Sequence, residues 1–294
     1  MERKRASKFD LKTSYDKVSI KYCLSAIAIL RKSLWIPAVM QKARFRNEKQ
    51  RSSFLDRGSF PKFCEQSSAY FLASYLSSNI GNNGFNFIKI REFKKGETVF
   101  FQDEEADFLY IIIEGIARLG CCGADSNEFT YAFAGPEDVI GELGVFQGSI
   151  YAESAIAISH LRTLAVDRNA FSSLEYEKDK SVLGALSKLV AHRFRTYIKS
   201  TRVVCSGDMT MRVAGALLQI GEQIGENAEF CDQRALRICS FVTQSDIGRL
   251  ANVSRSNVSR KLKEFEKAGF LKADGRSIYL LDKCSLKRVH EGCY

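Results

Sequence analysis

The stretch from residue 243 to 271, TQSDIGRLANVSRSNVSRKLKEFEKAGFL, constrains the fold more than any other part of the sequence. Apolar residues recur in it at helical spacing, in two sets separated by a break near Asn252. The two sets are Ile247 and Leu250, then Val258, Leu262 and Phe265. Asn tolerates the left-handed backbone conformation that a sharp turn between helices needs. The pattern predicts two short helices joined by a tight turn, a helix-turn-helix.

The second of these helices begins with side chains that can form hydrogen bonds outside the protein. Ser254 precedes it and suits the N-cap position, where its oxygen accepts a backbone N–H. Because the apolar face is buried, the polar residues of the first two turns must point outward, as they do in a helix that enters the DNA major groove. An ordinary solvated surface helix is the alternative, but the combination of cap, turn and paired Arg favours DNA. The candidate base-contacting residues are Arg255, Ser256, Ser259 and Arg260.

The segment SRSNVSRKLKEFEKAGFL resembles the recognition helix of the Crp/Fnr transcription regulators, whose pattern is roughly S-R-x-x-V-S-R before a Leu-rich helix and a short wing. The match continues through ADGRSIYLLD, where Asp274 and Gly275 suit a two-residue hairpin loop. The resemblance places Arg255, Ser256 and Arg260 against bases. Family members often carry Glu where this chain has Ser256, and a hydroxyl is less selective than a carboxylate facing cytosine N4. The residues that the resemblance places near phosphates are Thr243, Ser245, Ser254 and Asn257.

Residues 85–170 contain β-branched and aromatic runs at near-regular intervals, separated by Gly and other turn residues. This pattern predicts a sandwich or jelly roll. The blocks FKKGETVFFQDEEADFLYIIIEG and GPEDVIGELGVF also resemble the sensor domain of the same family, although Asp103 stands where a turn Gly is usual. The resemblance implies an α+β protein: an N-terminal β jelly roll (double-stranded β-helix), a long dimerisation helix and a C-terminal winged helix-turn-helix.

The effector pocket is expected at four residues of this sensor domain. Relatives that bind cyclic nucleotides use a Gly-Glu pair for the ribose, matched here by Gly141 and Glu142, and an Arg beside Ser or Thr for the phosphate. Glu153 and Ser154 stand at the second position. Because a carboxylate repels a phosphate, we predict that cyclic AMP is not the effector. Glu142 also has a purely structural interpretation, in which its carboxylate accepts backbone N–H groups of a tight loop.

Residues 181–205 predict a long helix with a heptad repeat, which usually pairs with a copy of itself. A helix packed only on its own domain is the alternative. The resemblance makes this segment the dimer helix, and two helix-turn-helix modules must be held about one DNA turn apart to bind a two-fold site. The candidate dimer-helix residues are Leu183, Leu186, Val190, Phe194 and Tyr197.

The nine cysteines and three histidines argue against a cofactor. The cysteines show no repeated C-x-x-C spacing, which disfavours a disulfide scaffold, a zinc site and an iron–sulfur cluster. The adjacent pair Cys121 and Cys122 remains a candidate redox element, although two small strand residues are the commoner case. The histidines form no paired motif, which argues against haem, and the lack of clustered metal ligands argues against a catalytic jelly roll. The three histidines are His160, His192 and His290.

The net charge of +10 is carried by the two ends of the chain, because residues 64–240 have more acidic than basic side chains. A basic DNA-binding module joined to an acidic sensor fits this asymmetry. The N-terminal segment contains the apolar run YCLSAIAIL, which is too short to span a bilayer and poorly placed for a signal peptide. An accessory helix, a basic arm on DNA or membrane, and a start at Met40 remain open for this segment.

The sequence therefore predicts four parts: an N-terminal extension at 1–65, a sensor domain at 66–178, a dimer helix at 179–206 and a winged helix-turn-helix at 207–294. The expected function is that of a cytoplasmic, non-enzymatic regulator that binds two-fold DNA as a homodimer and responds to a small-molecule or redox signal other than cyclic AMP. RNA polymerase is a candidate partner, and no membrane partner is expected. The alternatives are a thiol- or haem-based sensor of the same fold and a cyclic-nucleotide-responsive signalling protein.

Overall fold

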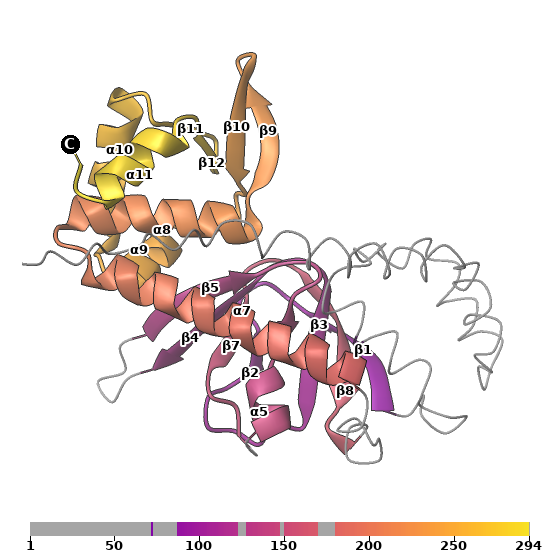
Figure 1. The fold of residues 1–294 in the computed structure, drawn as a ribbon. Coiled ribbons are helices and arrows are strands. Elements are labelled where there is room, and N and C mark those ends of the chain that lie inside the picture. The colour runs from indigo at the N-terminus through magenta and orange to yellow at the C-terminus, as the bar shows by residue number, and fades with distance from the viewer. Residues whose placement is uncertain (1–71, 73–86, 123–127, 148–149, 170–179, 294) are drawn as a thin grey trace, which may run out of the picture. The chain divides into compact units, whose positions relative to one another are not determined.

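The computed structural model describes residues 72, 87–122, 128–147, 150–169 and 180–293, so the predicted extension at 1–65 lies outside the described residues. Among the described residues, the strands β1 to β8 form the first folded part, most of them labelled in Figure 1. They pair into two four-stranded antiparallel sheets, ordered β1-β8-β3-β6 and β2-β7-β4-β5. This order is that of a jelly roll and confirms the predicted fold class. The strands are β1 Ile88–Phe93, β2 Thr98–Phe100, β3 Phe108–Glu114, β4 Ala117–Cys122, β5 Glu128–Ala134, β6 Val139–Ile140, β7 Ser154–Ala157 and β8 Leu161–Asp167.

The first and last strands of the roll are neighbours, since β1 pairs with β8 in a register that sets Ile88 opposite Val166.

Asp103 adopts a left-handed conformation with φ of 67°. The turn that usually carries Gly in the family therefore keeps its backbone shape here, because Asp tolerates this region better than most residues.

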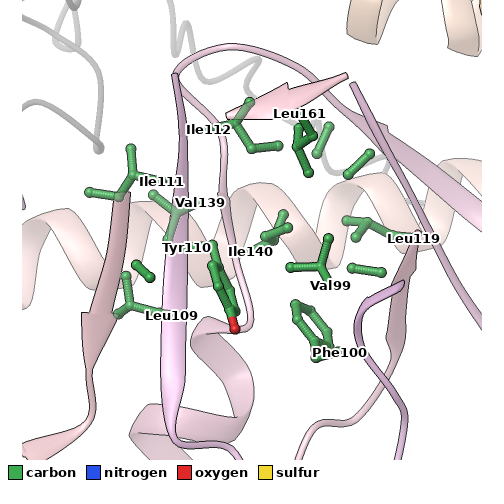
Figure 2. Close-up of a cluster of buried hydrophobic side chains, with 14 of the residues drawn as sticks. Val99, Phe100, Leu109, Tyr110, Ile111, Ile112, Leu119, Val139, Ile140 and Leu161 are labelled. Carbon is green, nitrogen blue, oxygen red and sulfur yellow. The ribbon is translucent and has the colours of Figure 1, made fainter. Parts of the chain in front are cut away.

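The core of the roll lies between the two sheets. Figure 2 shows Leu109 and Ile140 of one sheet in the same cluster as Val99 and Leu119 of the other. Consecutive residues on β3, from Leu109 to Ile112, are all at most 2% exposed. Because successive side chains of a strand point to opposite faces, both faces of β3 are covered. The short helix α5, Glu142–Gln147, follows β6 and carries Glu142 as its first residue.

The helix α7, Lys180–Cys205, connects the roll to the C-terminal part. Its two sides have different surroundings. Leu186 and Leu189 pack against the core of the roll, whereas Val190, Phe194 and Tyr197 are exposed. The predicted dimer-helix residues are thus divided between two faces, and Leu186 lies on the face that packs against its own domain. The side chain of Leu183 lies outside the described part of the helix.

The C-terminal part is a winged helix-turn-helix, as predicted. Its four-stranded sheet has the order β11-β12-β10-β9, and the hairpin β9–β10 was not predicted from the sequence. The wing departs from the expected loop by one residue: Asp274 pairs with Ser277, so the two loop residues are Gly275 and Arg276. The elements are α8 Met209–Ile224, β9 Glu226–Phe230, β10 Gln233–Ile238, α9 Gln244–Ala251, α10 Arg255–Lys267, β11 Leu271–Asp274, β12 Ser277–Leu280 and α11 Lys283–His290.

Among the described residues, no helix combines the length and the apolar character that crossing a bilayer requires.

Candidate functional site

The turn between α9 and α10 has the geometry that the sequence predicts. Asn252 ends α9 in the left-handed conformation, with φ of 50° and ψ of 52°. The side chain of Ser254 caps α10 by accepting the backbone N–H of Asn257. Gly248 lets the backbone of the turn lie against α9, because a Cβ at this position would lie 2.5 Å from the carbonyl oxygen of Val253. These local features fix the direction in which α10 leaves the turn.

The first two turns of α10 present polar side chains outward. Val258, Leu262 and Phe265 are buried in the core of the domain. Arg255, Ser256 and Arg260 are exposed, and Ser259 is partly exposed. The four residues predicted to contact bases thus share the solvent-facing side of one helix, with the helix N-terminus free to approach an anion.

Two of these side chains are already oriented by neighbours. Arg260 donates from Nη2 to Oδ1 of Asn257 at 3.2 Å and lies 3.4 Å from Sδ of Met209. The hydroxyls of Ser254 and Ser256 lie 3.1 Å apart. Within the described residues, Arg255 makes no side-chain hydrogen bond or ion pair, and its guanidinium remains available.

The predicted phosphate-contacting residues lie at the N-terminal ends of α9 and α10. Thr243 forms a capping box with Asp246, in which its hydroxyl accepts the Asp246 N–H and the Asp246 carboxylate accepts the Thr243 N–H. Ser245 and Asn257 are partly exposed, whereas Thr243 and Ser254 are exposed. Hydroxyl groups and backbone N–H groups at helix N-termini are common phosphate contacts.

The predicted effector residues lie in the roll, and two of them are buried carboxylates. Glu142 is 1% exposed and Glu153 is 6% exposed. Gly141 has a positive φ of 79°, which turns the chain from β6 into α5. Ser154 accepts the backbone N–H of Gln102 at 2.9 Å, so its hydroxyl is engaged within the roll.

Arg193 of α7 neutralises this buried charge, although the sequence analysis did not identify it. Its Nε lies 3.0 Å from Oε1 of Glu142, and its Nη2 donates to the carbonyl oxygen of Val139 at 2.7 Å. Burial opposes the charge of Arg193, but the nearby carboxylates of Glu142 and Glu153 outweigh it and raise its pKa. Oε2 of Glu142 is buried and receives no hydrogen bond from the described residues.

Glu153 is held differently. Its Oε2 accepts a hydrogen bond from the hydroxyl of Tyr131. Burial raises the pKa of the Glu153 carboxyl, and Arg193 only partly offsets this effect. The position at which the family resemblance implies a phosphate-binding Arg is therefore occupied by a carboxyl group whose pKa is raised by burial.

The roll and the DNA-binding part are joined by a charged cluster that the sequence analysis did not predict. Arg118 of β4 donates to Oε2 of Glu128 at 2.9 Å, and its Nε lies 3.8 Å from Oδ1 of Asp246 in α9. Arg249 of α9 forms a second ion pair with Glu128, with its Nε 3.0 Å from Oε2 of Glu128. The hydrogen bond from Arg118 is the main cause that lowers the pKa of Glu128, despite partial burial.

Apolar contacts accompany these charges. Phe133 and Ile158 of the roll belong to the same buried cluster as Val203 of α7 and Leu217 of α8. The backbone N–H of Phe133 also donates to Oε1 of Gln223 at 3.0 Å. A single apolar core thus continues from the end of the roll into the helix-turn-helix domain.

Comparison with known families and proteins agrees with this arrangement. Residues 90–175 match the cyclic nucleotide-binding domain, and residues 211–289 match the Crp-like helix-turn-helix domain. A CRP-like cAMP-activated global transcriptional regulator from Mycobacterium tuberculosis is 31% identical over 197 residues, which cover 67% of this chain and 86% of that protein. The cAMP-activated global transcriptional regulator Vfr from Pseudomonas aeruginosa is 26% identical over 192 residues, covering 64% and 87%.

Solved structures show the same fold. FixK2 from Bradyrhizobium japonicum aligns with a TM-score of 0.60 at 22% identity and covers 69% of this chain and 96% of that chain. A CRP-family transcriptional regulator from Thermus thermophilus aligns with a TM-score of 0.55 over 68% and 96% of the two chains. The jelly roll, the exposed face of α10 and these similarities lead to one conclusion: the chain belongs to the Crp/Fnr family of DNA-binding transcription regulators.

Proposed function

We propose that the protein is a homodimer that binds a two-fold symmetric DNA site with one α10 helix from each subunit. The observation that carries this proposal is the outward-facing set of base-directed side chains on α10. Arg255 and Arg260 can each form paired hydrogen bonds with the two major-groove acceptors of guanine. Ser256 should tolerate more bases at its position than a carboxylate would, since a hydroxyl can both donate and accept a hydrogen bond.

The exposed face of α7 supports the dimer. Phe194 is 63% exposed, Tyr197 is 51% exposed and Val190 is 41% exposed. These apolar side chains are spaced by three or four residues and form one stripe along the helix. A second copy of α7 would cover the stripe and hold the two α10 helices about one DNA turn apart.

The proposed signal is a small molecule or a redox change other than cyclic AMP. The named relatives from M. tuberculosis and P. aeruginosa are cAMP-activated, so cyclic AMP is the natural competitor. Glu153 argues against it, because a buried carboxyl at the implied phosphate position offers no positive charge and would repel the ligand if ionised. Arg193, whose positive charge acts on Glu153, is already ion-paired with Glu142.

A thiol signal is the second candidate, and the exposure of Cys122 favours it. Its neighbour Cys121 is less suited to the role, because burial raises the pKa of that thiol and lowers the thiolate fraction. Whether small molecule or thiol oxidation, the signal would act by shifting the populations of two arrangements in which α7 packs differently against the DNA-binding domain. A hundredfold preference for one state corresponds to about 2.7 kcal/mol, which moves a balanced equilibrium almost completely. RNA polymerase is the candidate partner through which bound protein would affect transcription.

The test is selection of DNA from a randomised duplex library by purified protein, with metabolite extract, with cyclic AMP, with oxidant and without addition. A two-fold site enriched only with extract supports a small-molecule effector and provides the assay for fractionating it. Enrichment only with cyclic AMP overturns the proposal for the signal, and a response to oxidant that Cys122→Ser abolishes favours the thiol. If no condition enriches a site, the proposed role of α10 is wrong.

A further inference from the structure

Tyr131 of β5 contacts both the predicted effector position and the elements that carry the DNA-binding domain. Its hydroxyl donates to Oε2 of Glu153. Its backbone carbonyl oxygen accepts hydrogen bonds from the Ser200 hydroxyl of α7 and from Nε2 of Gln219 in α8, the latter at 2.9 Å. Its ring meets the ring of Tyr197 edge to face, with centroids 5.9 Å apart.

All these polar contacts are buried. Ser200 is 0% exposed, Gln219 is 4% exposed and Tyr131 itself is 6% exposed. Gln219 also donates from Nε2 to the Ser200 hydroxyl at 2.7 Å, so the two helices and the strand share one compact hydrogen-bonded group. Because buried polar groups are costly without partners, β5 cannot shift at this residue unless α7 and α8 shift with it.

We propose that Tyr131 is the residue through which a change at Glu153 reaches the DNA-binding domain. The inference rests on the proposed function, since it assigns the route from the sensor position to α8. A ligand that draws the Glu153 carboxyl away removes the acceptor of the Tyr131 hydroxyl. The ring then moves against Tyr197, on the stripe proposed for dimer contact, and the carbonyl moves relative to Ser200 and Gln219.

The competing explanation is that the hydroxyl only satisfies a buried carboxyl and transmits nothing. The variants Glu153→Gln and Tyr131→Phe separate the two, because the first alters the acceptor and the second removes the hydroxyl while keeping the ring. Tyr110→Phe is the matched control. It removes another buried tyrosine hydroxyl of the roll, which accepts a hydrogen bond from Arg91 at 3.2 Å and has no contact with Glu153 among the described residues.

The experiment is a double-mutant cycle with two readouts. Amide hydrogen exchange of α8 and of the C-terminal half of α7 is measured in the full chain without DNA. Affinity is measured on the duplex enriched from the random library. Glu153→Gln is expected to change exchange in α8 and to change DNA affinity about three- to tenfold, a range typical of one altered hydrogen bond. In the Tyr131→Phe background the same substitution should change affinity by less than about twofold, whereas the Tyr110→Phe background should retain the full effect.

An equal effect of Glu153→Gln in the wild-type and Tyr131→Phe backgrounds would overturn the proposal. So would unchanged exchange in α8 after Glu153→Gln. If the wild-type protein enriches no DNA, the proposed function fails, and the exchange measurement still decides whether Tyr131 couples the roll to α8.

Discussion

Arg193 is the side chain on which the buried acidic groups of the roll depend. It comes from α7, 12% of its side chain is exposed, and it faces Glu142, which is 1% exposed. A buried ion pair is not in itself strong evidence of stability, because desolvation of both charges opposes their attraction. The ion pair between Arg193 and Glu142 instead couples the position of α7 to the charge of the buried carboxylates in the roll.

Arg260→Ala should weaken sequence preference more than general DNA affinity. We expect a loss of about 1–3 kcal/mol at one base pair of the selected site, because one forked base contact is removed. Fluorescence anisotropy on the selected duplex and on single-base variants measures this loss. Lys267→Ala, in the last turn of the same helix, is the control for removing one positive charge. An equal loss on random DNA would contradict a base-contacting role for Arg260.

Glu153→Gln should become more stable relative to the wild type as pH rises. Burial raises the pKa of this carboxyl in the folded state above the value of about 4.3 expected in the unfolded chain. The folded state therefore binds the proton more tightly, and wild-type stability contributed by this group is lost as pH rises from the unfolded pKa through the folded pKa. Gln has no proton to lose, so the difference in free energy of unfolding between variant and wild type should grow with pH.

Urea unfolding at a series of pH values measures that difference. Glu229→Gln, at an exposed site on β9, is the control for removing one carboxylate from the surface. If the difference in free energy of unfolding between Glu153→Gln and wild type stays constant with pH, desolvation does not raise the pKa of the buried carboxyl.

The helix α7 shows at the scale of one element how a single sequence pattern serves two surfaces. Leu186, Leu189 and Arg193 lie on the side toward the roll, while Phe194 and Tyr197 lie on the exposed side. A heptad pattern alone does not distinguish these sides, since both carry apolar residues.

Phe194→Glu should dissociate the proposed dimer. A charge in the middle of the apolar stripe would have to be buried against the partner helix, which we expect to cost about 2 kcal/mol or more of association free energy. Sedimentation velocity over a range of concentrations measures the change in dimer dissociation. Lys188→Glu, at an exposed polar position of the same helix, is the matched control. If Phe194→Glu associates as the wild type does, the stripe is not the subunit interface.

The helix-turn-helix was predictable because its signals are local. Asn252 and Ser254 lie within a few residues of the helix ends that they define. The strand composition of the roll was equally clear, whereas the wing loop shifted by one residue because Asp274 and Gly275 satisfy a turn as well as Gly275 and Arg276 do. The hairpin β9–β10 was missed, since β9 has no buried residue and β10 has only two, Ala235 and Ile238.

Site residues that come from elements far apart in the sequence could not be identified from a local sequence motif. Arg193 and Glu142 are 51 positions apart, and Arg118 and Asp246, which join the roll to α9, are still farther apart in the sequence. One signal did exist for Arg193. It follows Leu189 by four residues and Leu186 by seven, which places it on the face of α7 that packs against the roll.

At the scale of the whole molecule, the contact between the roll and α9 combines buried charges with a continuous apolar core. Arg118 is 8% exposed and Asp246 is 5% exposed. Asp246 also belongs to the capping box of α9, so its carboxylate serves the helix and the contact together. The position of the helix-turn-helix is thereby coupled to strands β4 and β5.

Arg118→Met should destabilise the protein and loosen α9. It removes hydrogen bonds to Glu128 and to Thr130, and we expect a loss of about 1–3 kcal/mol in the free energy of unfolding. Urea unfolding measures the loss, and amide exchange in α9 shows whether it is local. Lys199→Met is the control, because the two side chains of its ion pair with Glu222 are 50% and 63% exposed and the pair should contribute about 0–1 kcal/mol. Equal losses in the two variants would contradict a special role for the Arg118 contact.

The pairing of β1 with β8 has a consequence for biosynthesis. A ribosome releases the chain from its N-terminus, and Ile88 has no partner until Val166 has emerged. The apolar strands in between must wait in an open sheet, where exposed edges invite association with other chains. The helix-turn-helix, whose contacts are mostly local, can form as soon as it is made. The slow and vulnerable step in producing this regulator is therefore closure of its jelly roll, and conditions that slow translation after residue 167 give that closure more time.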